Sequence, residues 1–189
     1  MGAGGRRLVG PQRKDFDQEQ LRLYDLITGG PRAGDKSASP IVNTSGDLAG
    51  PFGPMLLSPA IGAPLQELGA AIRYRSSLPA RVREGVILMV AAAEVSAFEW
   101  SSHHALARTA GLTEADLADI HAGGIPLQGN AEESALFEAA LELVYGGDMS
   151  DSRYQEIVAS TGEKALFELG TLVGYYRTLA LLMRLFAID

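Results

Sequence analysis

The segment 94–104 carries the densest group of polar side chains in an otherwise apolar helical region of the sequence. On a continuous helix, Ser96, Glu99 and His103 fall at i, i+3 and i+7, so their side chains share one face. A carboxylate one turn before a histidine can hydrogen-bond the imidazole, fix its tautomer and favour its protonated form. Glu99 and His103 therefore have the spacing of a general acid/base unit. His104 is turned by about 100° from His103 and is expected to point elsewhere.

Spacing alone also fits a purely structural role for these residues. A Glu and a His at i, i+4 are common on solvated helix faces, and on spacing alone we favour that structural interpretation. Trp100 is then a packing residue rather than a substrate platform. His121 precedes a Gly-Gly helix end, where a cation is mildly stabilising. One Glu-x-x-x-His supplies two ligands without a second pair, so no metal site is predicted.

The composition sets the class of protein. The chain has 189 residues, 47% of them hydrophobic and 21% charged, which is typical of a globular protein. A net charge of -7 with scattered Lys and Arg argues against a nucleic-acid partner. There is no cysteine, which excludes disulfides, thiolate metal sites and cysteine-based redox chemistry.

Nothing in the sequence predicts membrane insertion or secretion. Residues 1–14 contain arginines but no apolar segment of the kind found in secretory signals. The longest apolar segment, 166–188, is interrupted by Glu168, Arg177 and Arg184, which favours a buried helix over a membrane span. We therefore expect a soluble, cytoplasmic protein without a membrane partner.

The elements that position Ser96, Glu99 and His103, called the polar stripe below, are predicted to be helices. No segment alternates convincingly with period two, so no sheet is expected and the class is all-α, with about seven or eight helices. Residues 29–54, rich in Gly, Pro, Ser and Asn, predict a long irregular segment that wraps the surface or a neighbouring subunit. Apolar spacing and capping residues predict helices over 15–28, 58–75, 79–111 with a break near Ser96 left open, 113–122, 130–145, 151–160 and 163–187.

Two of these helices have informative details. Thr113 and Asp116 form a variant capping box, with Asp in place of Glu or Gln. The helix 163–187 is apolar nearly all round and is therefore predicted to be central. Gly170 and Gly174, four residues apart, would let another helix pack tightly against it.

Two stretches of the sequence resemble a known superfamily. Residues 78–88 resemble the LPxRxRExxIL lead-in of the carboxymuconolactone decarboxylase and alkylhydroperoxidase-D superfamily. Residues 98–103, followed by Ala107 and 111–113, resemble its (Y/F)EWxxH…A…GLT signature. The resemblance implies an alkylhydroperoxidase-D-like helical bundle over residues 58–189, with residues 1–57 as an N-terminal extension. It also shifts our preference from the structural to the functional interpretation of the stripe.

The resemblance separates two branches of the superfamily. The peroxidase branch works through a Cys-x-x-Cys pair, and the matching positions here are Ser96 and Glu99. A hydroxyl and a carboxylate cannot perform thiol–disulfide exchange, so peroxide reduction by that route is excluded. The resemblance thus implies the decarboxylase branch, with Glu84, Glu99 and His103 as catalytic residues and no metal or organic cofactor.

The implied reaction is loss of CO₂ from a small carboxylated lactone, or a related proton-transfer step on a catabolic or secondary-metabolic intermediate. In this hypothesis protonated His103 delivers a proton to the carbon skeleton, Glu99 orients it, and a buried Glu84 influences the ionisation of both. Substrate-binding roles are expected for Ser96, Trp100 and Arg81, with Arg83 and Arg73 as further cations for the substrate carboxylate.

Other interpretations remain open at this point. A non-catalytic family member that binds a small molecule or serves in assembly is the alternative, and a peroxidase-like activity is the third. The resemblance also implies a homo-oligomer, a trimer or a multiple of one, or a dimer. The sequence does not decide whether His104 or His121 reaches the site.

Overall fold

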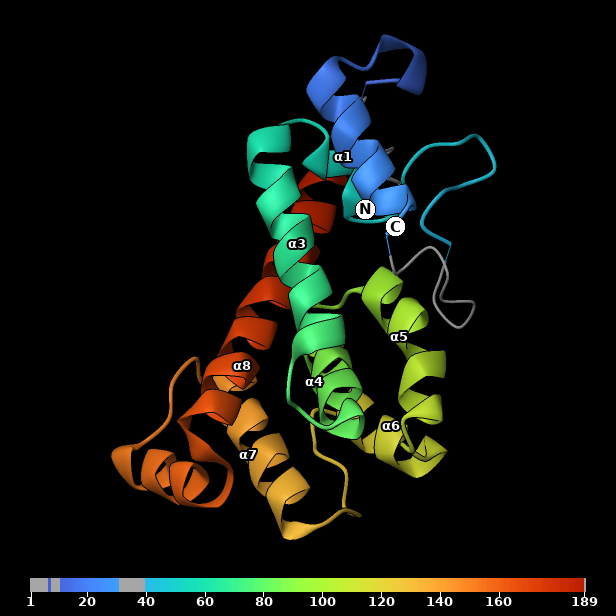
Figure 1. Ribbon diagram of the computed structural model, residues 1–189. Coiled ribbons are helices and arrows are strands. Elements are labelled where there is room, and N and C mark those ends of the chain that lie inside the picture. The colour runs from blue at the N-terminus through green and yellow to red at the C-terminus, as the bar shows by residue number, and fades with distance from the viewer. Residues whose placement is uncertain (1–6, 8–10, 31–39, 189) are drawn as a thin grey trace. The chain divides into compact units, whose positions relative to one another are not determined.

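The computed structural model describes residue 7, residues 11–30 and residues 40–188, and within them it is all-helical (Figure 1). A 3-10 helix, Arg13–Asp15, precedes eight α-helices. Their bounds are α1 Gln18–Thr28, α2 Phe52–Met55, α3 Pro59–Arg75, α4 Ala80–Ala93, α5 Ala97–Thr109, α6 Glu114–His121, α7 Ala131–Tyr145 and α8 Asp151–Phe186. No strand occurs in these ranges, so the predicted all-α class and number of helices are confirmed.

The chain divides into two compact units, which are described separately. One comprises the described residues up to 74 together with 179–188, and the other comprises residues 75–178. The domain boundary that the sequence suggested between residues 57 and 58 stays a prediction.

In the first unit, α1 begins with a capping box in which Asp17 and Gln20 exchange hydrogen bonds. The buried Tyr24 on α1 donates a hydrogen bond of 2.9 Å to the carbonyl of Gly46. This contact holds the described part of the predicted irregular segment, which has a single antiparallel bridge between Val42 and Leu48. Residues 31–39 of that segment lie outside the described residues, so its predicted course is not tested there.

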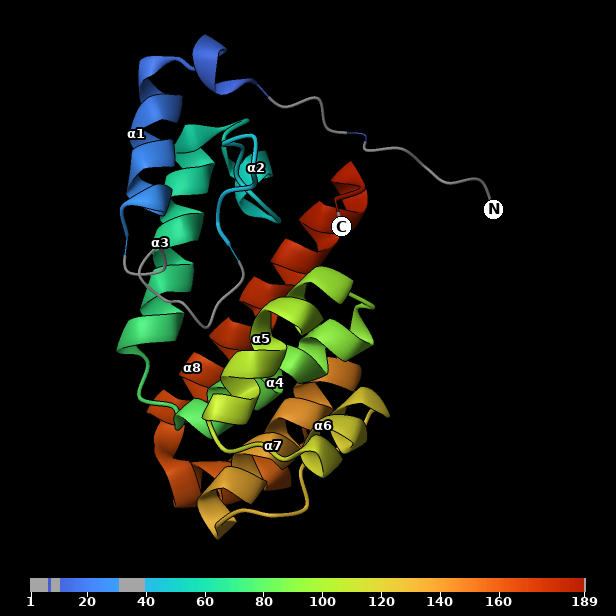
Figure 2. The ribbon, with the colours of Figure 1, turned by 90° about the vertical axis from the view of Figure 1, so that its right-hand side faces the viewer.

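The second unit is built around α4. This helix contacts α5, α6 and α7 (Figure 2), and nearly all its side chains from Val82 to Ala91 are buried. Gly85 lets Phe137 of α7 approach the α4 backbone, because a Cβ at this position would lie 2.6 Å from the phenyl ring. A helix buried on several sides is a rigid platform for any polar side chain that it carries.

The break near Ser96, which the sequence left open, is present between α4 and α5. Val95 adopts a left-handed conformation with φ 54°, and Ser96 then becomes the N-cap of α5. The Ser96 hydroxyl accepts a hydrogen bond from the Glu99 backbone N–H. The expectation that Ser96 continues the helical face of Glu99 and His103 is therefore wrong, because the helix begins only after it.

The later helices begin and end close to the positions predicted from their capping residues. Thr113 and Asp116 form the predicted capping box of α6, and Asn130 caps α7. Within α8, Gly162 has φ 80° and ψ 159°, which separates the short and long helices predicted on either side of it.

The C-terminal long helix is not covered all round. Phe167 is 75% exposed, and a Cβ at Gly170 or Gly174 would meet no atom within 4 Å. The predicted close packing of another helix at these glycines is therefore absent among the described residues. Apolar composition alone cannot reveal which face a neighbouring helix covers, which is why the pattern suggested a fully central helix.

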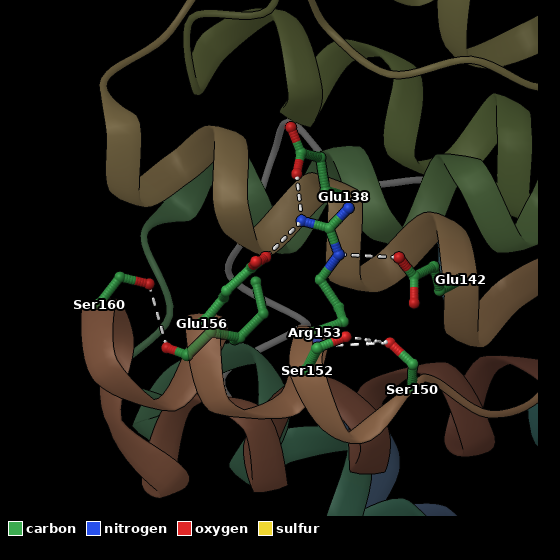
Figure 3. A network of polar contacts seen from close by, with 8 residues as sticks. Glu138, Glu142, Ser150, Ser152, Arg153, Glu156 and Ser160 are labelled. Atoms are coloured by element: carbon green, nitrogen blue, oxygen red, sulfur yellow. Dashed lines mark hydrogen bonds and ion pairs between the residues drawn. The ribbon is translucent and has the colours of Figure 1, made fainter.

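Arg153 in the first turn of α8 joins this helix to α7 (Figure 3). Its Nε donates to Glu142 and its Nη1 to Glu138, each at 2.9 Å, and Nη1 also contacts Glu156 at 3.1 Å. The hydrogen bond to Glu142 and the three nearby carboxylates together raise the pKa of Arg153.

In the part of the chain that the structure describes, no helix has the length and apolar character needed to cross a membrane.

Candidate active site

His103 and Glu84 form a buried hydrogen-bonded pair between α5 and α4. The Nδ1 atom of His103 lies 2.8 Å from the Oε2 atom of Glu84, and both residues are only 4% exposed. The two residues are nineteen positions apart, so the contact arises from the packing of α4 on α5 and not from one helical turn. An ionised carboxylate only accepts, so this contact assigns the Nδ1–H tautomer to the neutral ring.

The second ring nitrogen of His103 faces two oxygen atoms. Glu99 Oε2 lies 3.6 Å from Nε2, and the Tyr176 hydroxyl lies 3.4 Å from it. The Tyr176 ring meets the imidazole edge-to-face, with centroids 5.3 Å apart at 89°. The short contact that the sequence suggested for Glu99 is thus made by Glu84, and Glu99 lies near the opposite side of the ring.

Arg83 supplies a positive charge beside this pair. Its Nε lies 3.3 Å from Oε1 of Glu84, so the two oxygens of this carboxylate contact a guanidinium and an imidazole. A buried carboxylate needs such partners to offset the loss of hydration. The Arg83 side chain is partly exposed, and its Nη groups form no hydrogen bond or ion pair with the residues that the structure describes.

Arg81 is engaged away from the pair. Its guanidinium contacts Asp116 at 3.3 Å and Glu133 at 3.1 Å, and so ties α4 to α6 and α7. Burial alone would raise the pKa of Asp116, but hydrogen bonds from Thr113 and the charge and hydrogen bond of Arg81 outweigh it and lower that pKa. The Arg81 side chain thus has a structural role as an ion-pair partner, while its predicted substrate contact stays a prediction.

Trp100 packs among histidines on α5 and α6. Its ring meets His121 edge-on, with centroids 4.9 Å apart, and His104 at 6.4 Å. His104 in turn lies 3.9 Å from a carboxylate oxygen of Glu114. Among the described residues, neither His104 nor His121 hydrogen-bonds the Glu84–His103 pair, and no group of three or more His, Asp or Glu side chains could hold a metal ion.

Sequence reasoning missed Tyr176. This residue lies 73 positions after His103, in a helix whose apolar composition indicates only burial. The one available signal was the presence of two adjacent tyrosines, 175 and 176, in the middle of that helix, since a buried tyrosine hydroxyl usually has a polar partner.

The family comparison agrees with the resemblance seen in the sequence. The model of the carboxymuconolactone decarboxylase family matches residues 59–142. Residues 59–142 belong to this family. The matched region runs from the start of α3 into α7 and contains Glu84, Glu99 and His103, whereas Tyr176 lies outside it. No curated protein sequence matches the chain.

Two solved structures share the fold of this chain. They are the debrominase Bmp8 without ligand, and a cysteine-to-alanine variant of Bmp8 in complex with 2,3,4-tribromopyrrole. The TM-scores are 0.68 and 0.67, with 11% and 12% sequence identity, over 95% of this chain and 89% of theirs. At this identity the similarity shows the fold alone.

Proposed function

We propose that this protein is a cofactor-independent decarboxylase, a carbon–carbon lyase that acts on a small carboxylated lactone or a similar unsaturated acid. The observation that carries the proposal is the buried 2.8 Å pair of Glu84 and His103, which lies within the family match. A carboxylate that accepts from Nδ1–H fixes the orientation of the imidazole, and Nε2 is then the ring nitrogen that can transfer a proton as a general acid.

The reaction balances without an external redox partner. The bond between the ring carbon and the carboxylate breaks, CO₂ leaves, and the electron pair passes into the conjugated lactone. Nε2–H of His103 then supplies the proton to carbon, and the neutral ring recovers a proton from water. In this scheme Glu84 orients the acid, and Glu99 lies beside the reacting nitrogen, 3.6 Å from Nε2.

Arg83 is the cation best placed for the substrate carboxylate. Its Nε is held by Glu84, next to the histidine, while its Nη groups have no described protein partner. A guanidinium with an open edge can bind a carboxylate through two parallel hydrogen bonds. Arg81 fits this role less well because Asp116 and Glu133 already occupy its guanidinium.

A thiol-dependent reaction is not proposed. One of the similar Bmp8 structures is a variant in which a cysteine is replaced, and this chain has no cysteine at any position. The polar side chains that line the site instead offer oxygen and nitrogen groups, which can transfer protons.

The test is a mass-spectrometric screen of the purified protein against carboxylated lactones in D₂O. The expected product has lost CO₂ and gained one deuterium on carbon. Replacing His103 by Gln is expected to abolish this product, because amide nitrogen is not a general acid. The matched control, His104→Gln, changes the neighbouring histidine, which contacts Glu114 instead, and is expected to keep activity.

Two outcomes would contradict the proposal. Turnover that survives in His103→Gln would exclude His103 as the acid. The absence of product with every carboxylated lactone, together with a small molecule that co-purifies unchanged, would favour a binding function for the same site.

A further inference from the structure

The hydroxyl of Tyr176 lies at the one ring nitrogen of His103 that Glu84 does not occupy. Tyr176 is 3% exposed and belongs to the long helix of α8. Its oxygen lies 3.4 Å from Nε2, and its ring packs edge-to-face on the imidazole. The residue lies beyond the region that matches the family, so the family match assigns it no role.

The hydrogen-bonding needs of Nε2 change with the charge of the ring. With Nδ1–H directed to Glu84, Nε2 of the neutral ring carries a lone pair and requires a donor. The Glu99 carboxylate lies 3.6 Å away and in its ionised form cannot donate to this lone pair. When the ring is protonated, Nε2–H becomes a donor and requires an acceptor.

A tyrosine hydroxyl meets both needs because it rotates. It donates O–H to the lone pair of the neutral ring, and it accepts Nε2–H from the protonated ring through its oxygen. The 3.4 Å separation is at the long end of hydrogen-bond geometry, and hydrogen bonds of catalytic groups generally shorten when substrate binds.

We propose that Tyr176 is a positioning residue for His103, whose hydroxyl holds Nε2 in one orientation in both protonation states of the ring. The kinetic part of this proposal rests on the decarboxylase function proposed above. After Nε2 has given its proton to substrate carbon, the Tyr176 O–H turns to donate to the vacated lone pair, and its own proton stays on oxygen.

The substitution Tyr176→Phe tests this, because it removes the hydroxyl and keeps the ring that packs on His103. The matched control is Tyr175→Phe, which removes the neighbouring buried hydroxyl from a ring that packs edge-to-face on Tyr176. The first readout is the ¹⁵N resonance of His103 Nε2 in the neutral ring. We expect it to move downfield in Tyr176→Phe, as a nitrogen lone pair does when it loses a hydrogen-bond donor, and to stay in place in Tyr175→Phe.

The second readout is kinetic. Loss of one hydrogen bond that orients the acid should lower kcat by about tenfold in Tyr176→Phe. KM should stay unchanged, since the hydroxyl is proposed to act through His103 and not on the substrate. An equal loss of kcat in Tyr175→Phe would overturn the proposal, since it would show a general packing effect.

The NMR readout requires no substrate, so the two proposals can fail separately. An unchanged Nε2 resonance in a folded Tyr176→Phe variant overturns the positioning role even if decarboxylation is established. A shifted resonance supports the role of Tyr176 even if no lactone is turned over. If the variant does not fold, a nuclear Overhauser contact between the Tyr176 hydroxyl proton and His103 Hε1 in the unmodified protein supports the role, and its absence overturns it.

Discussion

At the scale of single residues, the decisive contact is the hydrogen bond between Glu84 and His103. Its partners come from two different helices and are both buried, so the contact depends on how α4 packs on α5. Arg83 contacts the other oxygen of this carboxylate, 3.3 Å from its Nε. These three groups leave Nε2 as the nitrogen of His103 that Glu84 does not contact, and it is the nitrogen to which we assign the proposed proton transfer.

Replacing Glu84 by Gln is expected to lower kcat of the proposed decarboxylation by about 10²- to 10⁴-fold. The reason is that the Gln amide can donate N–H to Nδ1 of His103, which favours the tautomer with the proton on Nε2 instead of Nδ1. The measurement is steady-state kinetics on the product of the lactone screen. The control is Glu114→Gln, which changes an exposed carboxylate that pairs with Arg108 and should retain activity. Equal kinetics in Glu84→Gln and the unmodified protein would contradict the orienting role of Glu84.

At the scale of elements, Glu168 of α8 hydrogen-bonds the turn that precedes α4. One of its carboxylate oxygens accepts hydrogen bonds from the Ser76 hydroxyl and from the backbone N–H and hydroxyl of Ser77, at 2.7 to 2.9 Å. Burial alone would raise the pKa of Glu168, but these three hydrogen bonds and the charge of Lys164 outweigh it and lower the pKa below its usual value.

The direction of this shift predicts a pH dependence of stability. A carboxyl group whose folded pKa is lowered contributes stability above its unfolded pKa, and that stability is lost as the pH falls through the folded pKa. Glu168→Gln should therefore lower the melting temperature at neutral pH and have less effect at acid pH, where the unmodified protein has also lost the charge. Melting curves of both proteins from pH 7 down to acid pH measure this effect. A difference in melting temperature between them that stays constant over this range would contradict the prediction.

The contact of α4 with α7 predicts a second effect on stability. Gly85→Ala should destabilise the protein by about 1–3 kcal/mol, because the added methyl group overlaps the Phe137 ring in a fully packed interior. Gly53→Ala in α2 is the control, because its added Cβ would lie at an ordinary contact distance of 3.5 Å from the Leu48 carbonyl oxygen, and it should raise stability by about 0.5–1 kcal/mol. Urea unfolding followed by circular dichroism distinguishes the two, and a neutral Gly85→Ala would show that Phe137 can move aside.

At the scale of the whole molecule, we propose that the protein is a homo-oligomer. The support is the uncovered apolar face of α8, where Phe167 is largely exposed and Gly170 and Gly174 have open space above them. An exposed apolar patch of this kind commonly marks a protein–protein contact. The family resemblance adds the expectation of a trimer or a multiple of one, or a dimer.

Light scattering after size exclusion should give a mass that is a multiple of 20.0 kDa. Phe167→Glu should shift that mass toward a single chain, because it places a charge in the contact, while circular dichroism stays unchanged. Glu132→Lys changes an exposed charge on α7, away from this face of α8, and is the control that should keep the oligomer. A monomeric mass for the unmodified protein would contradict the proposal.

The sequence by itself determined the helices, because their signals are local. The capping box of Thr113 and Asp116, the cap at Asn130 and the stop at Gly162 depend on residues within a few positions of each other. The family match likewise lies in a continuous stretch of sequence, and it contains three of the residues that line the site.

Only the tertiary structure decided which atoms of the site meet. Residue spacing placed Glu99 next to His103, but the packing of α4 on α5 gives the short contact to Glu84. Packing also directs Arg83, and not Arg81, to the site, although the two arginines differ by only two positions along α4. Tyr176 reaches His103 from 73 positions away, because hydrogen bonds between helices depend on how the helices pack, and a single sequence carries no direct signal of that packing.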